Sequence, residues 1–216
     1  LEYRFVLPGT ELSAPDLHRC FEVVRRRGHQ AAYVVLSGSL PPGVSADVVS
    51  WVRRQADSIG ARLVLDTSGG ALAHAHGTFL LKPSVRELGD HLGRRLDTLD
   101  EQLAGARELL LATDAGAVVL SRGHLGVALV TPAGAELLPA VAGDVVSGVG
   151  AGDALVAGII AGLVHGWDLS RATRLGLACS AAMIATPGTS VFSGDDLAAF
   201  TGDLPPLPAA TSGEAI

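Results

Sequence analysis

The sequence predicts an α/β fold, with a doubly wound, mostly parallel sheet that carries helices on both faces. Short apolar runs typical of strands alternate with runs of helical pattern along almost the whole chain. Polar residues repeatedly follow the strand ends, and one glycine-rich segment leads into a strongly apolar helix. In an open parallel sheet, the ligand crevice lies at the carboxyl ends of the strands. The sequence therefore predicts a binding site at that edge of the sheet.

Composition narrows the class of protein. The 216 residues are 48% hydrophobic and 4% aromatic, and they include 27 glycines, which suits one domain with closely packed helices. A net charge of −6 without a long basic run argues against nucleic acid or an anionic membrane as a partner. No segment has the pattern of a signal peptide, and the apolar run 154–164 is too short to span a bilayer. Cys20 and Cys179 fall in helical patterns and are interpreted as reduced and buried, in a cytoplasmic protein.

Two elements are predicted at the start of the chain. Alternating polar and apolar residues before Pro8-Gly9 predict a strand at 2–7. Ser13 predicts the amino cap of a helix that has Pro15 in its first turn and runs to Gly28. Because the chain begins at Leu1 and enters a strand directly, it resembles the middle of a longer protein.

The next elements come from short apolar runs and capping residues. Ser45 is predicted to cap a helix over roughly 46–59. Ser84 is predicted to cap another helix, with Glu87 in the capping-box position. Three strands, the first of them expected to be buried and parallel, are predicted at 32–36, 62–66 and 79–83.

In the second half, the sequence predicts a helix, a strand, a hairpin and three more helices. Asp168 is the predicted cap of a helix rich in small residues, and the Pro/Ala/Ser-rich tail from Gly202 is expected to be loose. The predicted helices are 99–113, a central one following Gly152, 169–185 and 195–200, and the predicted strands are 117–121, 126–130 and 136–140.

The central helix carries the main chemical prediction. Gly148, Gly150 and Gly152 lie at or just before its amino end, where unpaired backbone N–H groups and the helix dipole can receive a phosphate. Asp153 is the one ionisable side chain at this position, and it is suited to take a proton from a substrate hydroxyl. The alternative is that Asp153 only caps the helix. The segment is not a Walker A loop, because no Gly-Lys-Ser/Thr follows, and Leu155 replaces the third glycine of a dinucleotide fingerprint.

These residues resemble the PfkB-type carbohydrate kinases, which have a ribokinase-like fold. The resemblance extends from Tyr3 to about Asp196 and is strongest for the phosphosugar branch: 6-phosphofructokinase, 1-phosphofructokinase and tagatose-6-phosphate kinase. The motifs that carry it occur in the family's order: Tyr3-Arg4-Phe5-Val6-Leu7-Pro8-Gly9, Leu36-Ser37-Gly38-Ser39-Leu40-Pro41-Pro42-Gly43-Val44, Asp66-Thr67-Ser68-Gly69, Lys82-Pro83 with Glu87-Leu88, Ser121-Arg122-Gly123 with Gly126, and Val149-Gly150-Ala151-Gly152-Asp153.

The resemblance implies roles for the central segment and for one loop. Asp153 would deprotonate the acceptor hydroxyl, and the N–H groups of Gly150, Ala151 and Gly152 would form an anion hole for the γ-phosphate. Ser37 and Ser39 would help to hold the sugar phosphate, although both could simply be turn formers.

The resemblance also implies contacts with ATP and metal ions. Lys82 and Glu87 would act on the nucleotide phosphates and Mg²⁺, Glu87 through water. The alternatives are a solvated lysine at a strand end and a simple capping residue. The remaining implied residues are Ser84, Ser121, Gly123, Gly126 and Gly152 for the nucleotide, and Ser147, Val149, Thr186, Gly188 and Ser190 for a monovalent cation such as K⁺.

The chain departs from the family's pattern in three places. Ser84 replaces the usual Asn after Lys-Pro, Ala154 replaces a common Ser, and the family's N-terminal part is missing. The resemblance therefore divides the chain into a remnant of the β-lid at 1–9, the C-terminal portion of the kinase domain at 10–202 and a tail at 203–216.

The expected activity is ATP-dependent phosphorylation of fructose 6-phosphate to fructose 1,6-bisphosphate. Fructose 1-phosphate and tagatose 6-phosphate stay open as substrates, and so does a truncated, non-catalytic nucleotide-binding module. The loop 39–43 argues against a kinase for unphosphorylated sugars or nucleosides. The family further implies a homodimer formed through the β-lid.

Overall fold

The computed structural model describes residues 9–188 and 190–205. The strand predicted at 2–7, most of the proposed β-lid remnant and most of the predicted loose tail therefore lie outside the described residues. The chain forms two compact units, which are described separately below: Leu1–Leu120 with Val130–Gly134, and Ser121–Leu129 with Ala135–Ile216. No helix in the described ranges is long and apolar enough to cross a membrane.

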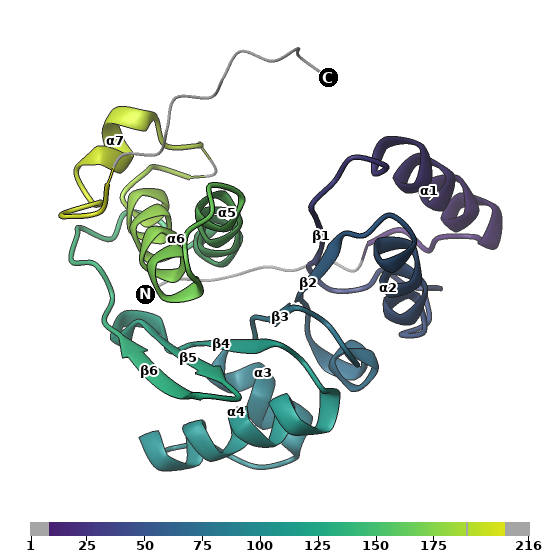
Figure 1. Cartoon of the computed structure of the whole chain (residues 1–216), viewed down its shortest axis with the longest axis horizontal. Helices are drawn as coiled ribbons and strands as arrows, with labels where there is room; N and C mark the ends of the chain where they lie inside the picture. Colours follow the sequence, from purple (N-terminus) through teal and green to yellow (C-terminus); the bar gives the residue numbers. More distant parts are fainter. Residues whose placement is uncertain (1–8, 189, 206–216) are drawn as a thin grey trace. The chain divides into compact units, whose positions relative to one another are not determined.

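Six strands form one sheet in chain order (Figure 1). The first four pair in parallel, with Leu36 beside Leu65, Leu65 beside Leu81, and Leu81 beside Val118. The two-residue connection between the last two strands makes them an antiparallel hairpin. The strands are β1 (Tyr33–Ser37), β2 (Arg62–Asp66), β3 (Leu80–Leu81), β4 (Ala117–Ser121), β5 (Val127–Thr131) and β6 (Gly134–Leu138). The mostly parallel α/β class is confirmed.

The first unit carries four of the α-helices. Ser13, Ser84 and Thr98 cap three of them, each in a capping box. In each box, the capping side chain accepts a hydrogen bond from the N–H of the third helical residue, and the carboxylate of that residue accepts one from the N–H of the capping residue. The helices are α1 (Ala14–Arg27), α2 (Val48–Ser58), α3 (Val85–Leu92) and α4 (Leu99–Thr113), with a short 3₁₀ helix η1 (Gly69–His74).

The second unit is built around two closely packed helices, α5 (Ala151–Val164) and α6 (Leu169–Ile184), which lie side by side in Figure 1. A Cβ added to Gly158 would lie 2.7 Å from Gly176 Cα, so the missing side chains let the two backbones approach each other. Burial raises the pKa of the Cys179 thiol to about 11, so this cysteine packs as an uncharged group in the same core. The unit also contains η2 (Gly123–Leu125) and α7 (Gly194–Ala198).

Several predicted details differ from the structure. Strand β1 is parallel but not buried, since it has a single neighbour among the described strands and Val35 is 43% exposed. Helix α2 begins at Val48 rather than at 46, because the Ser45 hydroxyl accepts from the Asp47 N–H in a turn that precedes the helix. Cys20 is exposed rather than buried.

Helix α5 is apolar almost all round, but only one of its faces is buried. Leu155, Val156 and Ile159 are buried, whereas Val164 at its carboxyl end is 60% exposed.

Candidate active site

The carboxyl ends of β2 and β3 bring a lysine and an aspartate together in the first unit. The backbone N–H of Lys82 donates to the Leu65 carbonyl, which continues the strand pairing by one residue. This register places Lys82 beside Asp66, and its Nζ lies 3.0 Å from Asp66 Oδ1. The two side chains are 7% and 14% exposed. Lys82 is therefore not the solvated lysine of the alternative interpretation.

The loop after β1 is tied to the same strand ends. The Gly38 N–H donates to the Asp66 carbonyl at 2.8 Å, and the Thr67 hydroxyl donates to the Gly38 carbonyl at 2.8 Å. Gly38 has a φ of +90°, which favours glycine at this turn. Ser37 and Ser39, predicted to bind the substrate, flank Gly38 and are both exposed.

The amino end of α3 follows Lys82 after one proline. Both the N–H and the hydroxyl of Ser84 donate to Glu87 Oε2 at 2.8 Å, and the Glu87 N–H donates back to the Ser84 hydroxyl. The serine that replaces the family's usual asparagine thus acts as a helix cap. Glu87 is half-buried, and its capping role is confirmed, while its role toward Mg²⁺ stays a prediction.

The second unit contains the glycine-rich amino end of α5. Gly150 is the first residue of this end and has a φ of +81°, a conformation in which residues with a side chain are strained. Side chains cap the starts of α1, α3, α4, α6 and α7, whereas α5, like α2, has no side-chain cap. Asp153 lies in its first turn and is exposed. The residues predicted to form the anion hole, Gly150, Ala151 and Gly152, thus form the start of a helix that no side chain caps, and their role toward an anion stays a prediction.

The loop before α5 is held by the end of α6. The N–H groups of Val146 and Ser147 both donate to the Ile184 carbonyl, at 2.8 and 3.0 Å. The Ser147 hydroxyl donates to the Gly188 carbonyl at 3.1 Å and accepts from the Val149 N–H at 3.3 Å. Three of the five residues predicted for a monovalent cation are thus joined directly.

The other two predicted cation ligands follow α6. The Thr186 hydroxyl donates to the Ala182 carbonyl at 2.9 Å, and the Ser190 N–H donates to the Pro187 carbonyl at 3.3 Å. All five residues belong to the second unit. Among the described residues, no group of three His, Cys, Asp or Glu side chains is placed to hold a metal ion.

The turn between β4 and β5 holds the remaining predicted nucleotide residues. Gly123 and Gly126 both have positive φ, of +61° and +87°. A Cβ on Gly126 would lie 2.1 Å from the Leu138 carbonyl oxygen, so only glycine fits there. The Arg122 N–H closes the turn by donating to the Gly126 carbonyl at 2.8 Å, and Ser121 precedes it.

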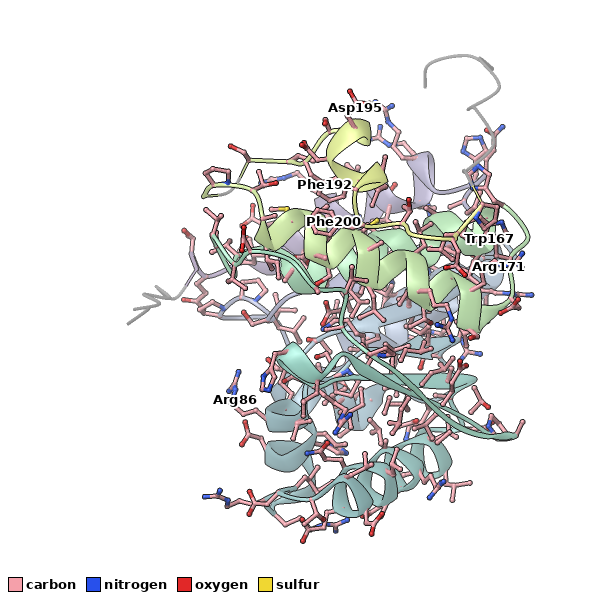
Figure 2. All side chains as sticks on the ribbon, turned by 90° about the vertical axis from the view of Figure 1, so that its left-hand side faces the viewer. Arg86, Trp167, Arg171, Phe192, Asp195 and Phe200 are labelled. Atoms are coloured by element: carbon pink, nitrogen blue, oxygen red, sulfur yellow. The ribbon has the colours of Figure 1, made fainter. Side chains whose placement is uncertain are left out.

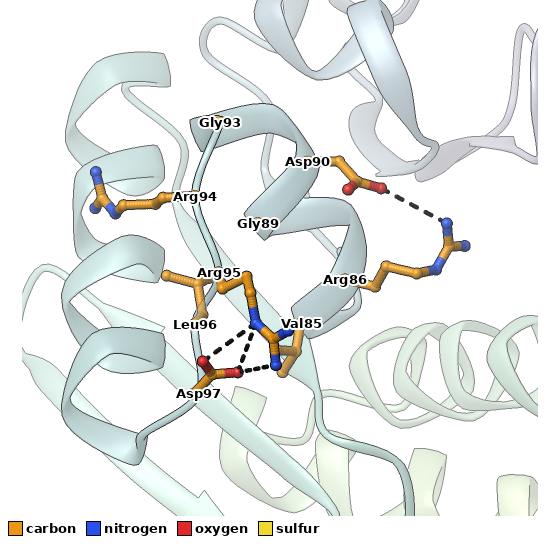
Figure 3. Close-up of a pocket in the computed structure, with 9 residues that line it drawn as sticks. All are labelled: Val85, Arg86, Gly89, Asp90, Gly93, Arg94, Arg95, Leu96 and Asp97. Carbon is orange, nitrogen blue, oxygen red and sulfur yellow. Dashed lines mark hydrogen bonds and ion pairs between the residues drawn. The ribbon is translucent and has the colours of Figure 1, made fainter.

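The structure has a cavity in each of the two units. The larger, about 810 Å³, is in the first unit along α3 and the segment that follows it. Two ion pairs lie in its lining, Arg86 with Asp90 and Arg95 with Asp97 (Figure 3). The smaller, about 260 Å³, is in the second unit and is lined by Leu138, Arg174, Leu177 and Phe200 among others; Phe200 lies beside α6 in Figure 2. None of the residues predicted for the site lines either cavity.

Sequence reasoning missed two contributors to the site. Asp66 stands in one of the family motifs without an assigned role, although its position at the carboxyl end of a buried strand signals one. Met183 packs against Gly150, since a Cβ there would lie 2.7 Å from Met183 Cε. Nothing in the local sequence around Met183 points to that contact.

Comparisons with known proteins show which proteins the chain resembles. The chain is 46% identical over 200 residues to the ATP-dependent 6-phosphofructokinase isozyme 2 of Mycobacterium tuberculosis. The aligned region covers 92% of this chain and 59% of the relative. It is 44% identical over 150 residues to the 1-phosphofructokinase of Rhodobacter capsulatus, covering 68% of this chain and 47% of the relative. The chain thus spans about half to three fifths of the length of these relatives.

The fold matches a solved structure at similar coverage. Phosphofructokinase-2 from Escherichia coli in complex with potassium superposes with a TM-score of 0.84 at 30% identity, over 94% of this chain and 66% of that one. The model of the pfkB family carbohydrate kinases matches residues 2–195. The chain belongs to the pfkB family of carbohydrate kinases.

Proposed function

We propose that the protein transfers the γ-phosphoryl group of ATP to fructose 6-phosphate and forms fructose 1,6-bisphosphate. The observation that carries the proposal is the amino end of α5, where no side chain caps the helix and Asp153 lies in the first turn. Backbone N–H groups there suit a phosphoryl group, and a carboxylate suits a proton acceptor. The choice of fructose 6-phosphate is supported by the name of the M. tuberculosis relative.

The proposed reaction is a direct displacement. The acceptor hydroxyl oxygen of the sugar forms a bond to the γ-phosphorus, the bond from that phosphorus to the β–γ bridging oxygen breaks, and ADP leaves. Asp153 takes the hydroxyl proton. The N–H groups of Gly150, Ala151 and Gly152 stabilise charge on the transferred group, and the Lys82 ammonium binds the nucleotide phosphates. Catalysis of this kind depends mainly on positioning and electrostatics.

Ions complete the proposed site. Mg²⁺ would neutralise phosphate charge, and the half-buried Glu87 carboxylate, a ligand of the type that this ion prefers, would hold it through a water molecule. Ser147, Val149, Thr186, Gly188 and Ser190 offer hydroxyl and carbonyl oxygens, which suit K⁺. The contact between Ser147 and Gly188 supports this grouping, and so does the potassium complex of the E. coli structure.

The full-length protein is the material for the test. We expect ADP release from MgATP with fructose 6-phosphate at a kcat/KM at least about tenfold above that with fructose 1-phosphate or tagatose 6-phosphate, because a site built for one phosphate position leaves polar groups unpaired with another. Unphosphorylated fructose is the control and should be a poor substrate. A preference for fructose 1-phosphate would assign the protein to the alternative that the R. capsulatus relative supports.

A non-catalytic role is the second candidate. The chain spans 59% of the M. tuberculosis relative, so groups that grip the sugar need not all be within it. Binding of MgATP without turnover on any of the three sugar phosphates would favour a nucleotide-binding module. A homodimer formed through the β-lid stays part of the proposal for the complete protein. Residues 1–8, which belong to the proposed remnant of the lid, lie outside the described ranges.

A further inference from the structure

Asp66 and Lys82 form a deeply buried ion pair. Lys82 Nζ lies 3.0 Å from Asp66 Oδ1, with the side chains 7% and 14% exposed. A comparable pair in the same unit, Arg53 with Asp57, has a similar separation of 2.9 Å but side chains that are 31% and 53% exposed. Lysine is rarely buried unless it is paired, because removing an ammonium from water is costly.

Stability alone does not explain this pair. The desolvation of two charges offsets most of their attraction, and a well-packed apolar pair at such a position is often as stable or more so. A buried carboxylate can instead fix the position of its partner's charged group. The lysine side chain has four flexible carbons, and a fixed partner limits where its ammonium can lie.

We propose that Asp66 is a positioning residue that holds the Lys82 ammonium at the carboxyl end of β3, ready for the nucleotide phosphates. This inference rests on the proposed function, in which Lys82 binds those phosphates. Asp66 itself makes and breaks no bond in the reaction. An ammonium has three N–H donors, so Lys82 can bind phosphate oxygens while it keeps its bond to Asp66.

Backbone geometry supports the same assignment. Asp66 ends β2 beside Ser37 of β1, and the Lys82 N–H extends the pairing of β3 with β2 by one residue. Both side chains therefore leave adjacent parallel strands at the edge where ligands bind in such sheets. The Gly38 N–H also donates to the Asp66 carbonyl, so the backbone of Asp66 is fixed as well.

A double-mutant cycle on the full-length protein tests the proposal. Asp66→Asn should raise the KM for ATP at least about tenfold, the effect of losing one hydrogen bond to a charged group, while the KM for the sugar phosphate stays within about threefold. Lys82→Met should raise the KM for ATP as well. In the Lys82→Met background, Asp66→Asn should add less than about threefold, because the group that it positions is gone.

Three readings of the cycle would overturn the proposal in distinguishable ways. If Lys82→Met leaves the KM for ATP unchanged, the role of Lys82 in the proposed function fails, and the inference fails with it. If Lys82→Met raises it but Asp66→Asn does not, the positioning role alone fails. If Asp66→Asn has the same effect in both backgrounds, Asp66 acts independently of Lys82, which also overturns the positioning role.

Two further variants separate positioning from damage to the fold. Asp57→Asn removes the carboxylate of the exposed pair and should leave the KM for ATP within about twofold, as expected for a surface ion pair. Partial unfolding would lower the apparent kcat, calculated per total protein, without changing the KM for ATP. If Asp66→Asn does not fold, Asp66→Glu takes its place in the same double-mutant cycle. This variant keeps the negative charge but moves it, and the same criteria apply to its KM for ATP.

Discussion

Gly150 occupies the amino cap of α5 in a backbone conformation that favours glycine. Its φ of +81° lies in the left-handed region, where a Cβ is strained, and a Cβ there would also press against Met183 Cε at 2.7 Å. The methyl end of a methionine can move, so the backbone conformation is the stronger of the two constraints. The glycine therefore permits the left-handed backbone turn that starts α5.

Asp153 should be essential for turnover if it accepts the proton from the substrate hydroxyl. We expect Asp153→Asn in the full-length protein to lower kcat at least about a hundredfold, the lower end of general-base effects, with a smaller change in the KM for ATP. Steady-state kinetics of ADP release measures both constants.

A helix-dipole role for Asp153 makes a different prediction. Asp100 lies in the first turn of α4 and is exposed like Asp153, so Asp100→Asn is a matched control for the loss of a carboxylate at a helix start. The control should keep kcat within about twofold. A kcat of Asp153→Asn within threefold of the unchanged protein would show that Asp153 is not the base.

Helix α4 illustrates how a single capping box makes stability depend on pH. The pKa of Glu101 is lowered from its ordinary value of 4.5, mainly because the Thr98 backbone N–H donates to its carboxylate and then because the Thr98 hydroxyl does so. The folded state thus favours the ionised carboxylate. Its contribution to stability is fully present above pH 4.5 and is lost as the pH falls through the lower folded-state pKa.

This dependence can be measured by thermal unfolding. Glu101→Gln should lower the midpoint of unfolding at pH 7, and the difference from the unchanged protein should shrink as the pH falls below 4.5, because protonation of Glu101 removes the charge that the capping hydrogen bonds stabilise. Asp100→Gln, in the same helical turn, is the control, because Asp100 accepts no capping hydrogen bond from Thr98. A difference that stays constant from pH 7 to pH 3 would contradict the assignment.

The elements that depend on local chemistry were predictable from the sequence. Helix α4 has its predicted bounds, and the caps at Ser13, Ser84 and Asp168 are confirmed, because a short polar side chain and the N–H groups that it caps are neighbours along the chain. The exposure of β1 was not predictable in this way, since burial depends on which segments lie beside a strand and not on its own apolar residues.

The candidate site shows the same limit. The glycine-rich start of α5 was predictable because its glycines and Asp153 are contiguous. The pairing of Asp66 with Lys82 depends on the register of two strands that are separated by η1, and the packing of Met183 against Gly150 depends on how α6 lies on α5. Contacts between residues far apart in the sequence require the fold itself.

The division of the chain into two units does not divide its sequence at one point. The chain passes from one unit to the other after Leu120, after Leu129 and after Gly134, and the residues of β5 (Val127–Thr131) are shared between the two. Unfolding of either unit therefore removes part of a strand from the other. We expect the whole molecule to unfold in one cooperative transition, although its length exceeds the range in which such behaviour is usual.

The two tryptophans allow each unit to report separately. Trp51 stacks on Phe21 in the first unit, and Trp167 lies beside Arg171 in the second, as Figure 2 shows. Trp51→Phe and Trp167→Phe each leave one fluorescent reporter. When each variant is unfolded in guanidinium chloride, its tryptophan fluorescence should give the same midpoint and slope as its own far-ultraviolet circular dichroism, because the shared strand couples the two units. A fluorescence midpoint that differs from the circular dichroism midpoint by more than about 0.3 M in either variant, beyond the usual error of such fits, would mean that one unit unfolds while the other stays folded.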